Sequence, residues 1–171
     1  MSFPESFSTA RLTAARLTAE HLPELIRMHR DGDVMQHLGG LRDRAQTQDY
    51  LARNLRHWDQ YGFGLWILSD ADGNGEPVGR AVLRHALIEG TDEVEVGYAF
   101  YRPFWGRGLA SEITAACLDH ARDDLGLDEI VGITSRPNTA SQHVLQKAGL
   151  RFDREFLYEG GPALLFRRSL R

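Results

Sequence analysis

The chain has 171 residues, 42% of them hydrophobic and 26% charged, a composition that is ordinary for a soluble globular protein. This length predicts one domain spanning residues 1–171. The net charge of −4 argues against a nucleic-acid partner, and no apolar run reaches the roughly 18 residues that a membrane helix needs. The single cysteine, Cys117, excludes an intramolecular disulfide and a cysteine-based zinc cluster. The N-terminus has no secretory pattern, so we expect a cytoplasmic protein.

The first third of the chain shows one strand pattern followed by two helix patterns. Residues 10–18 predict a strand, residues 20–29 a helix, residues 31–40 a loop with one helical turn, and residues 44–61 a second helix. Four arginines lie in or just before the second helix: Arg42, Arg44, Arg53 and Arg56. They are either a solvated helix face or the rim of a site for an acidic substrate, and both interpretations stay open.

The rest of the chain begins with strand patterns and then alternates between strand and helix. Strands are expected at 63–69, 77–87, 93–101, 128–135, 151–158 and 163–169, and helices at 109–125 and 137–148. The early strands follow one another through turns, whereas a helix joins later ones. We therefore predict a mixed α/β (α+β) fold in which the sheet is antiparallel at first and crosses over near residue 108.

Strand 93–101 has two chemically different faces. Val94, Val96, Tyr98 and Phe100 alternate with Glu93, Glu95, Gly97 and Ala99. The second face is small and acidic, which leaves room beside it for a ligand.

A glycine turn follows this strand and opens the helix at 109–125. Gly106 and Gly108 flank Arg107, so the backbone can approach a ligand closely while the free N–H groups of the helix start point outward. Such a turn favours an anion, most often phosphate. A nucleoside-triphosphate loop would need Gly-Lys-Ser/Thr, and the dinucleotide fingerprint would need Gly or Ala where Ser111 stands. An isolated Gly-x-Gly sequence would be interpreted as an ordinary surface turn without a ligand.

Two longer motifs, taken together, are specific. Glu95-Val-Gly-Tyr98 leads to Trp105-Gly-Arg-Gly-Leu-Ala110, and Asn138-Thr-Ala-Ser141 leads to Val144-Leu-Gln-Lys147 and Gly149. In this order and spacing, they resemble the GNAT superfamily of acyl-CoA-dependent N-acetyltransferases, and within it the RimJ/RimL branch of ribosomal-protein N-terminal acetyltransferases. The resemblance implies a GNAT-like domain whose sheet has about seven strands, splays between strands 4 and 5 and is flanked by about four helices.

The resemblance also implies a binding site for acetyl-CoA, without a metal. The turn would hold the pyrophosphate, Phe100 would make a main-chain contact with pantetheine, and Asn138 would lie near pantetheine or only cap its helix. Lys147 would reach a phosphate or remain solvated, and Arg107 would add a charge or stay a mobile surface side chain. The implied cofactor-binding residues are Phe100, Gly106, Arg107, Gly108, Leu109, Ala110, Ser111, Asn138 and Lys147.

The expected catalytic pair is Glu95 and Ser141. Glu95 is our candidate base because it shares a strand face with Gly97 and Ala99, although an ion pair across the sheet would explain it equally well. Leu145 stands where many relatives have a tyrosine acid, and by resemblance Ser141 is the branch's substitute.

The resemblance implies transfer of the acetyl group to a primary amine by direct attack. By resemblance, the acceptor is a protein or peptide N-terminus, and a homodimer is possible. The alternatives are a small-molecule amine such as an antibiotic or polyamine, and a non-catalytic acyl-CoA-binding regulatory module.

Overall fold

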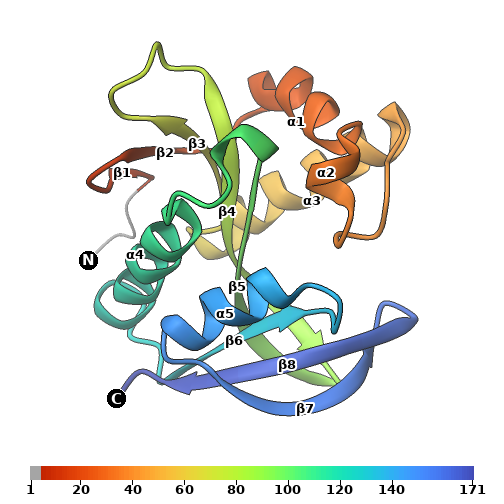
Figure 1. Cartoon of the computed structure of the whole chain (residues 1–171), viewed down its shortest axis with the longest axis vertical. Coiled ribbons are helices and arrows are strands. Elements are labelled where there is room, and N and C mark those ends of the chain that lie inside the picture. Colours follow the sequence, from red (N-terminus) through yellow and green to blue (C-terminus); the bar gives the residue numbers. More distant parts are fainter. Residues whose placement is uncertain (1–4) are drawn as a thin grey trace.

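The computed structural model describes residues 5–171 and forms one mixed sheet of eight strands in the order β1-β2-β3-β4-β5-β6-β8-β7 (Figure 1). The strands are β1 (Ser6–Ser8), β2 (Leu12–Arg16), β3 (Leu65–Asp70), β4 (Pro77–Ile88), β5 (Thr91–Phe100), β6 (Glu129–Thr134), β7 (Arg151–Tyr158) and β8 (Gly161–Ser169). Every neighbouring pair is antiparallel except β5 and β6, which are parallel. The predicted α/β fold and its change of direction after residue 100 are confirmed.

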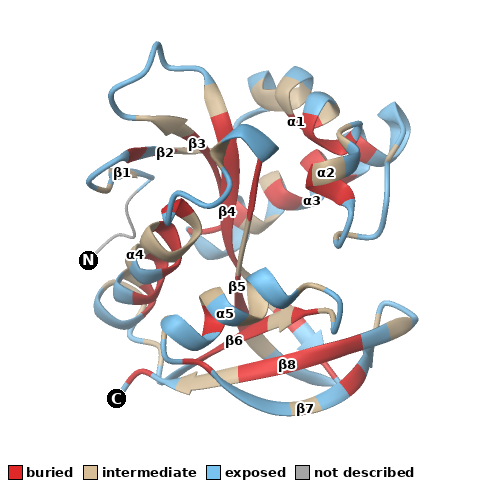
Figure 2. Cartoon of the chain, viewed as in Figure 1, coloured by how far each residue is buried: buried red, intermediate tan, exposed pale blue. Residues whose placement is uncertain are grey.

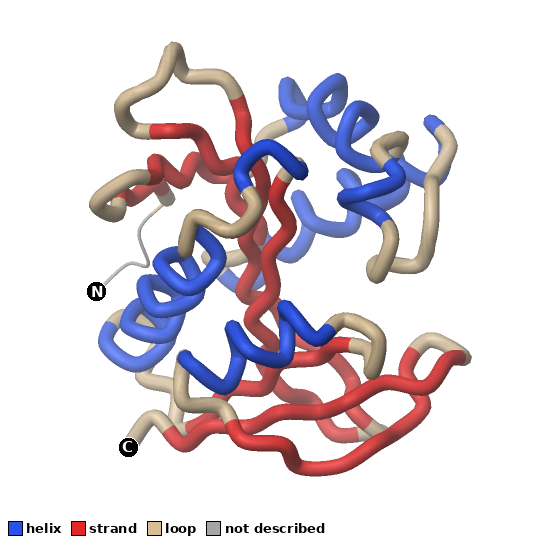
Figure 3. Tube along the Cα trace, viewed as in Figure 1, coloured by secondary structure: helices blue, strands red, loops and turns tan. Residues whose placement is uncertain are grey.

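Helices flank the sheet and connect its two halves (Figures 1 and 3). The α-helices are α1 (Leu22–His29), α2 (Gly32–Met35), α3 (Arg44–Tyr61), α4 (Leu109–Asp123) and α5 (Thr139–Lys147). Single 3-10 turns occupy Ala19–His21 and Arg102–Phe104. The limits of α3 match the prediction because Asp43 caps its start in a capping box with Gln46 and Gly62, in the left-handed region, ends it.

The sequence underestimated two element counts in the described chain. The sheet has an eighth strand because the three residues of β1 pair with β2, a segment too short to show a period of its own. The five α-helices include α2, a single turn at the position where one helical turn was expected. The first long helix starts at Leu22 rather than residue 20, since a 3-10 turn precedes Pro23 at its start.

The sheet splays between β5 and β6. Strands β4 and β5 pair along ten residues, whereas the register of β5 with β6 contains only Glu95 opposite Val131. Beyond this contact the carboxyl ends of the two strands separate, as Figure 3 shows, so backbone groups of β5 lack a strand partner there. The splay confirms the predicted opening between the strands at 95–101 and 129–135.

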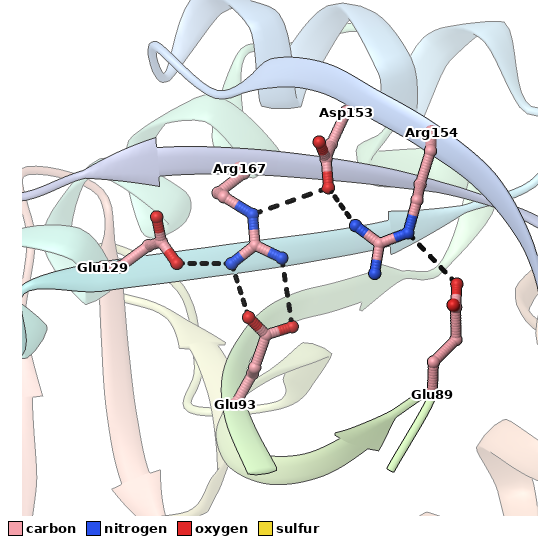
Figure 4. A network of polar contacts seen from close by, with 6 residues as sticks. All are labelled: Glu89, Glu93, Glu129, Asp153, Arg154 and Arg167. Carbon is pink, nitrogen blue, oxygen red and sulfur yellow. Dashed lines mark hydrogen bonds and ion pairs between the residues drawn. The ribbon is translucent and has the colours of Figure 1, made fainter. Parts of the chain in front are cut away.

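One arginine joins the strands at the closed end of this splay (Figure 4). Arg167 of β8 forms ion pairs with Glu93 of β5 and Glu129 of β6, and its Nε lies 3.6 Å from Asp153 of β7. Hydrogen bonds to Glu93 contribute most to raising the pKa of Arg167, so its charge is firmly held. One guanidinium thereby connects four strands where the sheet must stay closed.

Replacing this arginine is expected to loosen the sheet. We expect Arg167→Gln to lower the free energy of unfolding by about 1–2 kcal/mol, because the half-shielded carboxylates lose a charged donor. Urea unfolding measures this. In the control Arg171→Gln, the ion pair with Asp128 is exposed to solvent, so its loss should leave the free energy of unfolding nearly unchanged. Equal losses in the two variants would contradict the role of Arg167 as a tie between strands.

The core lies on both faces of the central strands (Figure 2). Helix α4 buries Ile113, Cys117 and Leu118 against one face, and α3 buries Tyr50 and Trp58 on the other side of the molecule (Figure 1). Cys117 is buried as predicted, and burial raises the pKa of its thiol to about 12. The thiol therefore remains protonated near neutral pH and does not serve as a nucleophile.

Candidate active site

The glycine turn presents the start of α4 to solvent. Gly106 and Gly108 have φ angles of 71° and 76°, in the left-handed region that glycine adopts without strain. Gly108 occupies the N-cap position, and no side chain of the described residues caps the helix there. The first N–H groups of α4 are therefore available to an anion, and the dipole of a 15-residue helix adds to the attraction.

The N-terminal segment fixes the shape of this turn. Arg11 donates from its guanidinium to the carbonyl oxygen of Arg107 at 2.7 Å and to Glu112 Oε1 at 2.8 Å. Glu112 Oε2 also accepts hydrogen bonds from Thr9 Oγ1 at 2.6 Å and from the Arg11 N–H at 2.9 Å. With the Arg107 carbonyl held by Arg11, the turn is fixed before a ligand binds. The sequence analysis missed this contact, since about a hundred residues separate its two sides.

The Glu112 carboxylate is expected to help hold the glycine turn in the shape that binds acetyl-CoA. Burial raises the pKa of Glu112, but the hydrogen bonds from Thr9 and Arg11 outweigh it and lower the pKa below its ordinary value. We expect Glu112→Gln to raise the KM for acetyl-CoA by about 3–10-fold with little change in kcat, because about 0.5–1.5 kcal/mol of preorganisation is lost. Asp119→Asn, an exposed carboxylate on the same helix, should leave KM unchanged. A normal KM in Glu112→Gln would show that the turn holds its shape without this contact.

A cleft of about 400 Å³ lies in front of the turn, at the splay. It contains seven of the nine residues predicted to bind the cofactor: Phe100, Gly106, Gly108, Leu109, Ala110, Ser111 and Asn138. Arg107 lies outside its lining, with its guanidinium 5.7 Å from the centre of the Phe104 ring. Lys147 is exposed at the end of α5. The cleft brings the glycine turn, the end of β5 and the start of α5 to one place.

Phe100 offers one backbone group to this cleft. The N–H of Tyr101 donates to Val78 of β4, so the alternation of an antiparallel ladder turns the N–H of Phe100 away from β4 and toward the splay. The Phe100 carbonyl oxygen accepts a hydrogen bond from Trp105 Nε1 at 2.8 Å. Its carbonyl is thus engaged within the chain, and the amide is the group that remains for a ligand.

A residue that the sequence analysis assigned to an apolar face also faces this cleft. Tyr98 of β5 lines it, and the Ser141 side chain approaches the Tyr98 phenol. Burial raises the pKa of Tyr98, and the neighbouring Ser141 side chain opposes the rise. Asn138 caps α5, because its Oδ1 accepts from the Ser141 N–H at 3.1 Å. The prediction that Asn138 caps its helix is confirmed. The sequence analysis did not predict that Ser141 lies beside the Tyr98 phenol.

Glu95 is buried on the other side of β5, only 5% exposed. It forms an ion pair with Arg84, which stands directly opposite on β4. The cross-sheet ion pair considered for Glu95 therefore exists. Glu95 and Tyr98 alternate to opposite faces of β5, so a base and an acid at these positions would act from the two sides of the splay.

Residues 5–171 contain neither a candidate membrane helix nor a candidate metal cluster. No helix among them is long and apolar enough to cross a membrane. In the same part of the chain, no group of three or more His, Cys, Asp or Glu residues is placed to hold a metal ion.

Comparisons with known proteins agree with this site. A family model for the acetyltransferase (GNAT) domain matches residues 11–151. The FsC-acetyl coenzyme A-N(2)-transacetylase of Aspergillus fumigatus is 31% identical over 154 residues, which cover 83% of this chain and 63% of that protein.

Solved structures share the whole fold. The acetyltransferase of Agrobacterium tumefaciens superposes with a TM-score of 0.84 at 26% identity, covering 98% of this chain and 95% of that one. RimL, a ribosomal L7/L12 α-N-protein acetyltransferase solved in complex with coenzyme A, gives a TM-score of 0.76 at 16% identity, covering 99% and 98%. The second likeness concerns the fold alone. Because the family model matches most of the chain and a glycine turn lies at a splayed sheet, this chain belongs to the GNAT acetyltransferase family.

Proposed function

We propose that the protein transfers the acetyl group of acetyl-CoA to a primary amine by direct attack, with both substrates bound at once. The observation that carries this proposal is the cleft itself, which joins the anion-binding start of α4 to the unpaired edge of β5. The pyrophosphate of acetyl-CoA fits the N–H groups of the turn, and pantetheine fits the gap between β5 and β6 as an added strand would.

The side chains at the splay have distinct tasks in this reaction. The amine nitrogen attacks the thioester carbonyl, and the Phe100 N–H donates to the oxygen that gains negative charge. As the carbon–sulfur bond breaks, the departing thiolate takes a proton from the hydroxyl pair formed by Ser141 and Tyr98. Glu95, directly or through water, takes the proton that the amine loses. No covalent enzyme intermediate is needed.

We propose a protein or peptide N-terminus as the acceptor. The RimJ/RimL-like motifs support it, and so does amine chemistry: an α-amino group with a pKa near ~8 is partly neutral in cells, whereas a lysine side chain near ~10.4 is not. A carboxylate such as Glu95 then suffices as the base. The likeness to the FsC N(2)-transacetylase favours a second candidate, a small-molecule amine.

An acceptor screen separates these candidates. The screen offers acetyl-CoA together with three classes of acceptor. The first is peptides with a free N-terminus, the second is peptides that are blocked at the N-terminus and contain lysine, and the third is a set of polyamines and aminoglycosides. We expect acetylation of the free N-termini alone, read by mass spectrometry. Acetylation confined to the small amines would replace the proposed acceptor, and a complete lack of transfer would favour an acyl-CoA-binding module.

The base assignment predicts a rate that depends on pH. Because the acceptor amine is already partly neutral, we expect Glu95→Gln to lower kcat only about 10-fold at pH 7. The deficit should shrink as the pH rises through the amine pKa near ~8, since less amine then needs deprotonation. Initial rates across this range measure it, and urea unfolding checks that Arg84, left without its partner, has not destabilised the fold. A deficit that is constant with pH would remove Glu95 from the proton path.

A further inference from the structure

Three arginines surround the ring of Tyr50 on α3. The guanidinium carbons of Arg42, Arg80 and Arg53 lie 4.8, 5.1 and 6.0 Å from the centre of that ring. Arg80 also donates a hydrogen bond to the Tyr50 hydroxyl. Arg42, Arg53 and Arg80, which we name the arginine cluster, come from three separate segments of the chain that the fold brings together around Tyr50.

Arg80 is a buried cation without a counter-ion in the described chain. It is 7% exposed, no carboxylate of residues 5–171 lies within ion-pair distance, and its Nε has no hydrogen-bond partner there. Burial above all, then the charges of Arg84 and Arg42, lowers the pKa of Arg80 to about 9. An unpaired buried guanidinium is costly for the folded state, and an anion beside it would offset that cost.

No neighbouring group within residues 5–171 forms an ion pair with the arginine cluster. Burial, followed by the charges of Arg80 and Arg42, lowers the pKa of His29 to about 3, so this buried histidine is neutral. Its Nε2 accepts a hydrogen bond from Arg42 at 3.2 Å and supplies no negative charge. Glu95, the carboxylate that acts on Arg80, is paired with Arg84. Glu159, the carboxylate that acts on Arg42, is exposed at the β7–β8 turn.

The arginine cluster adjoins the active-site cleft. Arg80 is paired across the sheet with Ala99, and Arg42 donates to the Leu38 carbonyl oxygen; both Ala99 and Leu38 line that cleft. A second hollow of about 410 Å³ opens over α3 and is lined by Arg42, Arg53, Arg56, Gln46, Asp49 and Ala52. Positive charge therefore extends from the wall of the cleft to the surface.

The register gives the distance between this charge and the reaction. Arg80 stands opposite Ala99, four positions along β5 from Glu95, which corresponds to about 13 Å at about 3.3 Å per residue. A peptide bound in extended form spans this distance in about four residues. A carboxylate near the third or fourth residue would thus reach the arginine cluster while the N-terminal amine lies at Glu95.

We propose that the arginine cluster binds an acidic side chain of the acceptor, so that the enzyme prefers peptide N-termini with Asp or Glu at the third or fourth residue. This inference rests on the proposed function and specifies its substrate class. It also chooses between the two interpretations of the α3 arginines: Arg42 and Arg53 form the rim of a site for an acidic substrate.

Binding and turnover with two matched peptides test the inference separately. The peptides are Ser-Ala-Asp-Glu-Ala-Ala and its amide counterpart Ser-Ala-Asn-Gln-Ala-Ala, each titrated by calorimetry into the protein saturated with coenzyme A. We expect the acidic peptide to bind about 10–100-fold more tightly, as charge-assisted hydrogen bonds imply. Arg42→Gln and Arg53→Gln should each reduce this ratio at least severalfold, whereas Arg44→Gln, exposed on the same helix outside the cluster, should leave it unchanged.

The binding and turnover results test the charge preference and the proposed acetyl transfer separately. Equal binding of the two peptides, or a ratio that both cluster variants preserve, would overturn the charge preference even if both peptides are acetylated. Preferential binding of the acidic peptide without any acetylation would support the arginine site and remove the proposed transfer to N-termini. Should Arg42→Gln unfold, Arg53→Gln still decides the matter, since Arg53 is exposed.

Discussion

Gly108→Glu is expected to weaken acetyl-CoA binding about 100-fold. Gly108 has a φ of 76°, and a Cβ there would lie 3.4 Å from the Arg11 guanidinium that holds the turn. The new carboxylate would also face the pyrophosphate at the start of α4. Losing one or two charge-assisted hydrogen bonds to an anion costs about 3 kcal/mol, which weakens binding about 100-fold.

Thermal unfolding reads this out. At a hundredfold excess of acetyl-CoA over its Kd, the wild type should gain about 2.7 kcal/mol, a rise in Tm on the order of 5–10 °C. Gly108→Glu should show almost no rise. The matched control is Gly126→Glu, which follows the other end of α4 at a φ of 63° in open space. It bears similar backbone strain and should keep the full response to acetyl-CoA; a full response in Gly108→Glu would mean that the cofactor binds elsewhere.

Loss of the Ser141–Tyr98 hydroxyl pair is expected to slow the chemical step most. We expect Ser141→Ala and Tyr98→Phe each to lower kcat about 100-fold, the lower range for loss of a general acid, with the KM for acetyl-CoA nearly unchanged. Because the two hydroxyls act as one unit, the double variant should be little slower than either single one.

Steady-state kinetics with a serine-terminated peptide tests this pair. Tyr61→Phe, which removes a phenol that is 39% exposed on α3, should keep the wild-type kcat. If the effects of the two single variants multiply in the double variant, the hydroxyls act independently. If neither single variant slows turnover, the thiolate takes its proton from another source, and the assigned acid is wrong.

Patterns among neighbouring residues predicted those features of the structure that a short segment determines by itself. The glycine turn, α3 and the alternation along β5 follow from neighbouring residues, and each lies where the sequence placed it. Tyr98 was grouped with Val94, Val96 and Phe100 as part of an apolar face. That grouping missed its role in the cleft, because the gap it faces arises only when β5 separates from β6.

Contacts between distant segments could not be predicted in the same way. Nothing near Arg11 indicates that its guanidinium holds the carbonyl of Arg107, and nothing near Arg80 indicates a ring on α3. These pairs depend on the order of strands in the sheet and on how the helices cover it. The cofactor cleft could be predicted because its residues belong to motifs that resemble the family. The residues of the arginine cluster belong to no such motif, so the cluster could not be predicted.

In the proposed reaction, the acetyl group passes directly from acetyl-CoA to an amine held in the same complex. Initial rates with acetyl-CoA and an N-terminal serine peptide, each varied at several fixed concentrations of the other, test it most directly. We expect double-reciprocal lines that intersect, together with no acetylation of the enzyme incubated with acetyl-CoA alone. Parallel lines with an acetylated enzyme intermediate would contradict it, since they are the mark of a covalent two-step route.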